Sequence, residues 1–240
     1  MNRNLLRALI VGFIILISGS AFAQSGGLNF MLGFPQGEFK KSVDRTGYGI
    51  DGYVVFWNVT PSMPFTLGVN GSYMTYGSED RREPFSSSIP DVTVNVSRTN
   101  NIASFHLLLQ VMPPAGNFRP YIEGLVGGSY LFTKTEVNNE GNANSEIASS
   151  TNFDDWAWSY GGGGGIMFKV FEMPEKEGDN NGAPKLNSLW VDLKVRYLLG
   201  SEADYLKEGA VRIEQGKVIM NPSRSHTDMI TAHIGVVFMF

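Results

Sequence analysis

The chain has 240 residues, a formal net charge of −4 and no cysteine. This length suits one domain of ordinary size. Without cysteine, disulfides, thiolate metal sites, a cysteine nucleophile and a lipidated N-terminal cysteine are excluded. The excess of acidic over basic side chains argues against nucleic acid as a partner, because nucleic-acid-binding surfaces are basic.

The first 23 residues predict a signal peptide that is cleaved on export. Arg3 and Arg7 precede an apolar run from Ala8 to Ile17, and Ala21-Phe22-Ala23 supplies a small-x-small cleavage pattern. The apolar run is about half the roughly 20 residues that a spanning helix needs. The mature chain is therefore expected to be a single domain over residues 24–240, whose net charge falls from −4 to −6 because two basic residues are lost.

Alternation of apolar and polar residues dominates the rest of the chain and predicts an all-β domain. It is clearest over Leu189–Gly200, where one face is wholly apolar and the other carries three charged residues. No apolar stretch after residue 23 is long enough for a spanning helix. The segments expected as strands are Leu28–Phe34, Tyr48–Val59, Phe65–Tyr76, Asn100–Val111, Arg119–Lys134, Asp155–Phe171, Leu189–Gly200 and Thr227–Phe240.

Long and short connections alternate between these segments, with one exception. Membrane barrels of bacteria have an even number of strands, short periplasmic turns and long outer loops. The pattern predicts an eight-stranded antiparallel up-and-down transmembrane β-barrel, with outer loops at 77–99 and 201–226. The exception is the long, charged connection at 172–188, which is expected as a solvated periplasmic turn.

Aromatic residues cluster towards both ends of the expected lipid-facing surface, where the two interfaces of a membrane would lie. Strand length also favours a membrane over a soluble barrel, since several segments exceed the usual five or six residues. The expected outer girdle is Tyr48, Tyr73, Tyr130, Phe132, Trp156, Trp158 and Tyr197, and the periplasmic girdle is Phe56, Phe65, Phe168, Phe238 and Phe240.

Charged residues on the opposite face predict a polar network in the lumen. Exposure of these charges to lipid would cost a few kcal/mol each. Two interpretations remain open: side chains pair and fill the narrow interior of an eight-stranded barrel, or a narrow path for solutes or protons passes Glu123, Lys194 and Arg196. The expected network is Asp51, Glu123, Lys169, Asp192, Lys194 and Arg196.

Evidence for catalysis or a cofactor is weak. Ser104 and His106 are too far apart along one strand to hydrogen-bond to each other. Ser225, His226 and Asp228 lie close together at the expected outer rim, but nothing in the sequence shows that they form a catalytic triad. The run Gly161–Gly165 is no phosphate loop, because neither Lys-Ser nor Lys-Thr follows it and it continues into a strand. No metal-binding spacing is present, and no cofactor is expected.

The end of the chain, Ile234-Gly235-Val236-Val237-Phe238-Met239-Phe240, resembles the last strand of Gram-negative outer-membrane proteins. The whole mature chain resembles small barrels of the OmpA/OmpX/OmpW type, and Arg196–Gly200, Tyr205-Leu206, Gly209 and Asp228 resemble an uncharacterised group of them. The resemblance implies a multi-pass barrel in the outer membrane, in contact with its lipid. It also implies recognition of Phe238 and Phe240 by the barrel-assembly machinery.

Three functions follow from this sequence. The first is a non-enzymatic barrel with a structural or surface-interaction role through its outer loops. The second is a narrow diffusion channel, and the third is an enzyme that modifies outer-membrane lipid through His226 or His106. The ligand or surface partner is not indicated by any motif.

Overall fold

In a computed structural model, the described part of the chain comprises residues 24–58, 60, 63–86, 89–139, 142–173, 186–207, 209–214 and 217–240. Side chains are described outside the segments 83–92, 138–148 and 211–218. The predicted signal peptide and most of the predicted turn at 172–188 lie outside these residues. None of the described helices has the length and apolar character needed to cross a membrane.

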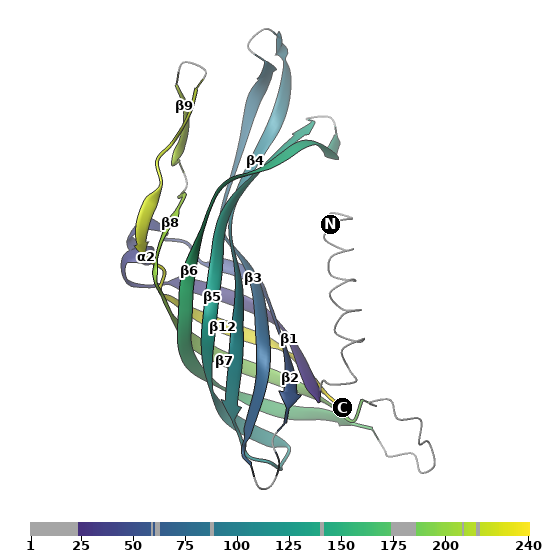
Figure 1. Cartoon of the computed structure of the whole chain (residues 1–240). Coiled ribbons are helices and arrows are strands. Elements are labelled where there is room, and N and C mark those ends of the chain that lie inside the picture. The colour runs from purple at the N-terminus through teal and green to yellow at the C-terminus, as the bar shows by residue number, and fades with distance from the viewer. Residues whose placement is uncertain are drawn as a thin grey trace.

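Eight long strands form one closed antiparallel barrel, which confirms the fold predicted from the alternation (Figure 1). Neighbours in the chain are neighbours in the barrel, and the first and last strands pair to close it. The strands are β1 (Ser25–Pro35), β2 (Gly47–Trp57), β3 (Phe65–Ser86), β4 (Ile89–Val111), β5 (Phe118–Asn139), β6 (Asn142–Glu172), β7 (Ser188–Gly200) and β12 (Met229–Met239).

The strands are tilted, as closure of so small a barrel requires. The pairing register shows this tilt. A path that steps from each residue to its direct partner on the next strand begins near the C-terminal end of β1 and finishes at the C-terminal end of β2, which lies at the other end of the barrel. That path runs through Phe34, Ile230, Tyr197, Gly162, Gly124, Leu109, Leu67 and Trp57.

The two ends of the barrel differ. At the turn end, short connections at 58–64 and 112–117 join β2 to β3 and β4 to β5. At the hairpin end, the β3–β4 and β5–β6 hairpins continue far beyond the barrel wall (Figure 1). The predicted loop at 77–99 is therefore wrong: most of it is strand, with Arg82 paired to Asn95. Its first half, from Gly77 to Glu83, is polar and shows no alternation, but backbone pairing does not need an apolar face.

A small cap covers the hairpin end of the lumen. It contains α2 (Gly37–Ser42), from the connection between β1 and β2, and four short strands from the predicted loop at 201–226. Two of these strands pair beside α2, and the other two form a separate hairpin. The strands are β8 (Glu202–Tyr205), β9 (Val211–Glu214), β10 (Lys217–Met220) and β11 (Ser223–His226).

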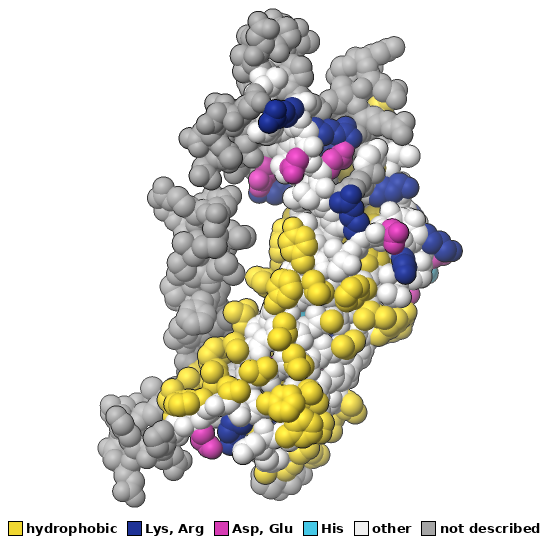
Figure 2. All heavy atoms as spheres, turned by 180° about the vertical axis from the view of Figure 1, so that it is seen from behind, with side chains coloured by type: hydrophobic (Ala, Val, Ile, Leu, Met, Phe, Trp, Pro, Cys, Tyr) yellow, Lys and Arg dark blue, Asp and Glu magenta, His cyan; other side chains and the backbone are white. Residues whose placement is uncertain are grey.

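The barrel wall presents its apolar face outwards. Figure 2 shows hydrophobic side chains over the wall and charged side chains beyond it at the hairpin end. Trp158 and Ile122 are each 66% exposed, whereas their strand neighbours Ser159 and Glu123 point inwards and are buried. The outward alternation therefore agrees with the prediction for a surface in contact with lipid.

Both ends of the wall carry exposed aromatic rings. Near the hairpin end, Tyr73 contacts Phe132, with 6.2 Å between ring centroids. Near the turn end, Phe118 contacts Phe168 with 5.1 Å between centroids. Exposed rings absent from the predicted turn-end girdle are Trp57, Phe118 and Phe171.

Candidate functional site

Arg196 of β7 is the centre of a charged network in the lumen. Its Nη1 donates to Asp51 Oδ2 of β2 over 2.9 Å, and its Nε donates to Glu123 Oε1 of β5 over 2.6 Å. The three side chains are at most 2% exposed. One guanidinium thus joins strands from three parts of the barrel wall, through charge-assisted hydrogen bonds.

Lys194, two residues earlier on the same inward face of β7, extends the network. Its Nζ lies 3.3 Å from Asp51 Oδ1 and 3.4 Å from Asp192 Oδ2. The same ammonium lies 4.5 Å from the centre of the Tyr53 ring. His233 adds a third contact to Asp51, with 3.5 Å between Nδ1 and Oδ1.

Neutral side chains hydrogen-bond to the carboxylates. Asn29 and Asn70 donate to Asp51 over 3.0 and 2.6 Å. Gln110 donates to Glu123 over 3.1 Å, and the Tyr121 hydroxyl donates to Asp192 over 2.7 Å. These donors matter because a buried carboxylate without partners would be strongly destabilising. The sequence alternation places each of them on the polar face, which is the signal that could have added them to the predicted network.

The structure brings five of the six predicted network residues together and leaves Lys169 apart. Lys169 lies at the turn end, where its Nζ contacts Glu172 Oε1 at 3.0 Å. It also lies 5.5 Å from the ring of Trp190, which Arg119 approaches at 4.6 Å. The alternation predicts the face of the strand on which Lys169 lies. It does not predict the position of Lys169 along the barrel axis, because that position depends on strand tilt.

Glycines on the inward face of β6 make room for the network. A Cβ at Gly165 would lie 2.6 Å from the Tyr121 hydroxyl and 2.7 Å from the Leu193 carbonyl oxygen. A Cβ at Gly163 would lie 3.0 Å from Arg196 Cγ. Glycine within a strand often marks a close approach of neighbouring atoms, and these two positions are of that kind.

Apolar clusters lie on both sides of the charged network. We name them the hairpin-end cluster, which includes Met31, Met74, Leu131 and Met229, and the turn-end cluster, which includes Tyr53, Leu108, Tyr121, Met167 and Trp190. The hairpin-end cluster borders a cavity of about 30 Å³, which has room for about two waters. The network is thus enclosed along the barrel axis.

The cap closes the hairpin end with aromatic contacts. Phe39 of α2 is fully buried, and its ring lies 5.6 Å from Tyr76 and 5.0 Å from Tyr205. The Tyr205 hydroxyl hydrogen-bonds to Ser225 over 2.8 Å, which ties β8 to β11. Because Phe39 and Tyr205 come from different connections, the two segments hold each other over the lumen.

The candidate catalytic groups are dispersed. His226 Nδ1 contacts the Gly200 carbonyl oxygen at 3.2 Å, and Asp228 accepts from the Gly200 amide over 3.0 Å. Ser225 bonds to Tyr205, so the contacts among these described residues form no serine, histidine and aspartate relay.

His106 has a serine neighbour that sequence spacing did not reveal. Its Nε2 lies 3.0 Å from Ser159 Oγ of β6, while Ser104 bonds to Ser129. No described residue hydrogen-bonds to the buried His106 Nδ1. The third group that would orient such a base is therefore missing from this part of the chain.

No protein-family model matches the sequence, and no curated protein is significantly similar to it. Similar solved structures include the N-terminal β-barrel domain of Pseudomonas aeruginosa OprF (12% identity, 91% of this chain, 98% of that chain, TM-score 0.37). They also include Neisserial surface protein A (11% identity, 90% of this chain, 96% of that chain, TM-score 0.39). A third is a major outer membrane protein from Thermus thermophilus (13% identity, 90% of this chain, 99% of that chain, TM-score 0.37).

The chain folds as a closed eight-stranded antiparallel barrel whose wall presents an apolar face outwards. Similarity at these identities concerns the fold alone, and the site described here belongs to this chain's own residues.

Proposed function

We propose that the protein is a non-enzymatic barrel of the outer membrane, with a sealed lumen and a surface-interaction role carried by its long hairpins. The observation that carries this proposal is the enclosure of the Arg196 network between two apolar clusters. The residues of the lumen tie the wall together, and the residues beyond the wall meet the cell's surroundings.

The exterior of the barrel supports placement in a membrane. Exposed apolar side chains cover every barrel strand, including Phe30 on β1, Phe105 on β4 and Ile234 on β12, each at least 50% exposed. A continuous apolar surface of this kind marks a membrane or protein contact. Because the apolar face surrounds the closed wall, lipid is the occupant that fits it best.

The lumen supports a sealed barrel more than a channel. A path past Glu123, Lys194 and Arg196 would have to cross ion pairs that are almost fully buried. It would also have to pass Phe39 and Tyr205 at the hairpin end. Both barriers would need to rearrange before an ion could pass.

The hairpins support a role beyond the membrane. β3, β4, β5 and β6 continue as one paired sheet past the wall, with Val96 joined to Arg81 on one side and Val137 on the other. The Lys134–Glu136 ion pair, whose side chains are 37% and 30% exposed, fits a solvated surface. An ordered sheet presents its side chains at fixed positions, which is what specific recognition requires.

The proposal of a non-enzymatic role rests on the surroundings of the histidines. The one serine in hydrogen-bond reach of a histidine ring among the described residues, Ser159, sits beside a cavity of about 30 Å³. That space is too small for a lipid or peptide substrate.

Conductance of the refolded mature chain in a planar bilayer tests the sealed lumen. Insertion is checked independently by slower gel mobility after boiling. Insertion without current supports the proposal, whereas steady ohmic steps would overturn it in favour of a diffusion channel. A chain that folds but does not enter bilayers would overturn the membrane placement.

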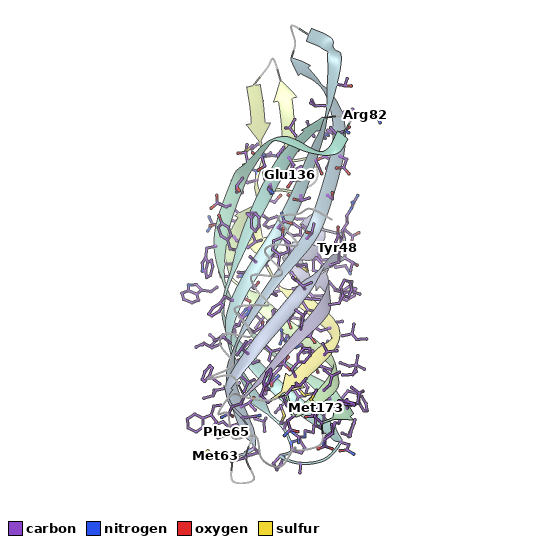
Figure 3. All side chains as sticks on the ribbon, turned by 90° about the vertical axis from the view of Figure 1, so that its right-hand side faces the viewer. Tyr48, Met63, Phe65, Arg82, Glu136 and Met173 are labelled. Atoms are coloured by element: carbon purple, nitrogen blue, oxygen red, sulfur yellow. The ribbon has the colours of Figure 1, made fainter. Side chains whose placement is uncertain are left out.

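The orientation of the barrel in the membrane can be tested with single-cysteine variants, because the chain has no natural cysteine that would also react. Figure 3 places Arg82 on an extended hairpin and Met63 at the turn end. Arg82→Cys should react with an impermeant maleimide in intact cells. Met63→Cys is the matched control and should react only after the outer membrane is opened, and the reverse result would contradict the orientation.

A further inference from the structure

Gln24, the residue that follows the predicted cleavage point after Ala23, is held at the start of the barrel wall on both sides. Its backbone nitrogen donates to the Val55 carbonyl oxygen of β2 over 2.9 Å. Its carbonyl oxygen accepts from the Phe240 amide over 3.1 Å, next to β12. Gln24 therefore lies where the first strand meets both of its neighbours in the closed barrel, near the end marked C in Figure 1.

The side chain of Gln24 binds the same part of the chain as its backbone nitrogen. Its Oε1 accepts from the Asn58 amide over 2.7 Å, and Asn58 follows directly on β2. The register of β2 shifts between Val55 and Trp57. Such a bulge changes the direction of the backbone groups that follow it. The end of β2 thus offers Gln24 one acceptor, on Val55, and one donor, on Asn58.

A glutamine at the N-terminus of a chain can react with itself. The unprotonated α-amino nitrogen attacks the side-chain carbonyl carbon, so that the N–Cδ bond forms and the Cδ–Nε2 bond breaks. Nε2 leaves as ammonia, with the proton that the α-amino nitrogen gives up. The product is the lactam pyroglutamate, and the step needs no oxidant, reductant or co-reactant. Gln24 is exposed, so the ammonia can leave into solvent.

The lactam would keep the hydrogen bonds that Gln24 makes to the end of β2. Ring closure leaves one hydrogen on the nitrogen, which can still donate to Val55, and it leaves the oxygen that accepts from Asn58. The ring also holds its N–H and C=O groups cis, unlike the trans arrangement of most peptide bonds, so both groups point to one side. That side is the one on which β2 presents its acceptor and its donor.

Charge favours the lactam as well. A free N-terminus would carry a positive charge beside the segment of β2 that bears Phe56 and Trp57, whose rings are 48% and 47% exposed at the turn end. An apolar rim disfavours an ionised group, and the lactam is neutral. We propose that Gln24 closes to pyroglutamate after cleavage and caps β1 as a neutral lactam. This inference rests on the proposed export and signal-peptide cleavage, and it goes beyond the proposed function.

The test is mass spectrometry of the full chain, expressed with its own signal peptide in a Gram-negative host and extracted from the outer membrane. Heat-dependent gel mobility first shows that the extracted protein is a folded barrel, which judges the membrane placement separately. The tryptic peptide of residues 24–40 is expected to be lighter than its sequence predicts by one ammonia in most molecules. An open glutamine on this peptide would overturn the cyclisation, and a chain that begins at another residue would overturn the site.

Two controls separate this reaction from artefacts of handling. An isotope-labelled synthetic peptide of residues 24–40, with open Gln24, is added before extraction. If it cyclises to the same extent as the protein, the lactam forms during work-up and the proposal is overturned. Gln24→Asn is the matched variant, because its shorter side chain could close only a smaller, strained ring. Its peptide should lose no ammonia, and a loss would place the reaction at another residue and contradict the assignment.

The fit of the lactam beside β2 is tested by stability. A chain released at Gln24 from an N-terminal tag is divided, one half is cyclised with glutaminyl cyclase, and both halves are refolded in micelles. Because the bonds to Val55 and Asn58 are kept, the midpoint of urea unfolding should be at least as high for the cyclised chain as for the open one. A lower midpoint would show that the ring does not fit there and would overturn the capping role.

Discussion

Arg196 and Asp51 are 145 residues apart in the chain and meet inside the barrel, with 2.9 Å between Nη1 and Oδ2. One lies on β7 and the other on β2, which are not neighbours in the barrel order. The pair therefore crosses the lumen and ties together two parts of the wall that share no backbone hydrogen bonds.

Replacement of Arg196 by Met should destabilise the barrel strongly. It would leave Asp51 and Glu123 buried without their main cation, and loss of one partner from a buried ion pair typically costs 3–5 kcal/mol, so a loss of about 4 kcal/mol is expected. Urea unfolding in micelles would measure it. Arg224→Met is the matched control, because its pair with Glu202 is exposed and should contribute at most about 1 kcal/mol.

The charge balance of the network gives a second criterion for this prediction. Adding Asp51→Asn and Glu123→Gln to Arg196→Met removes the unpaired carboxylates and should recover much of the lost stability. If the triple variant is no more stable than Arg196→Met, the loss comes from packing and not from buried charge.

Two glycines should respond differently to the same substitution. Gly165→Ala should destabilise the barrel by roughly 1–3 kcal/mol, because the new methyl group meets the Tyr121 ring and the Leu193 carbonyl oxygen. Gly124→Ala is the control, since nothing lies within 4 Å of its added Cβ. Equal effects in urea unfolding would show that β propensity, and not space in the lumen, governs these positions.

The fold could be predicted from the sequence because alternation reports directly on the two environments of the wall. Glu123 and Ile122 are adjacent in the chain, and their burial follows from their polarity alone. The extended hairpins could not be predicted this way. Arg82 and Asn95 pair beyond the barrel wall, and there the β3 half of the hairpin, from Gly77 to Glu83, is polar throughout and shows no alternation.

The sequence predicts which charged residues face the lumen, but not which of them contact each other. Asp51 and Arg196 were placed in the lumen by the face they share with other polar residues. That His106 meets Ser159, or that Lys169 lies at the turn end, depends on strand tilt and register. Sequence spacing within one strand carries no information about either quantity. Likewise, nothing in the segment around Phe39 predicts a cap, because its partners Tyr76 and Tyr205 come from distant segments.

A charge on the apolar wall should have a cost that depends on depth. Val126→Arg places a guanidinium near the middle of the exposed apolar face, where the expected cost is about 2–4 kcal/mol in a bilayer. Phe118→Arg lies at the end of β5 and should cost no more than about 1 kcal/mol. Urea unfolding from lipid vesicles measures both. Equal costs would argue against a membrane around this wall.

Loss of the Phe39 ring should loosen the cap without opening the lumen. Phe39→Ala removes a fully buried ring, at a typical cost of 3–5 kcal/mol that falls on contacts of the cap, so about 4 kcal/mol of cap stability should be lost. Faster amide exchange is expected in β8 and β11, with barrel amides unchanged. The variant should still carry no current, because the Arg196 network remains in place. Current steps in this variant would show that the cap alone seals the lumen.

The final phenylalanine should matter for assembly in cells more than for stability. Phe240 is 41% exposed at the end of the last strand, and its amide donates to the Gln24 carbonyl oxygen over 3.1 Å. Phe240→Ala keeps this backbone bond, so refolding in micelles should be nearly unchanged. The level of folded protein in the outer membrane, measured by heat-dependent gel mobility, should fall if assembly machinery reads this side chain. Phe34→Ala, which also removes a 37% exposed ring from the barrel, is the control, and equal membrane levels of the two variants would contradict the predicted signal.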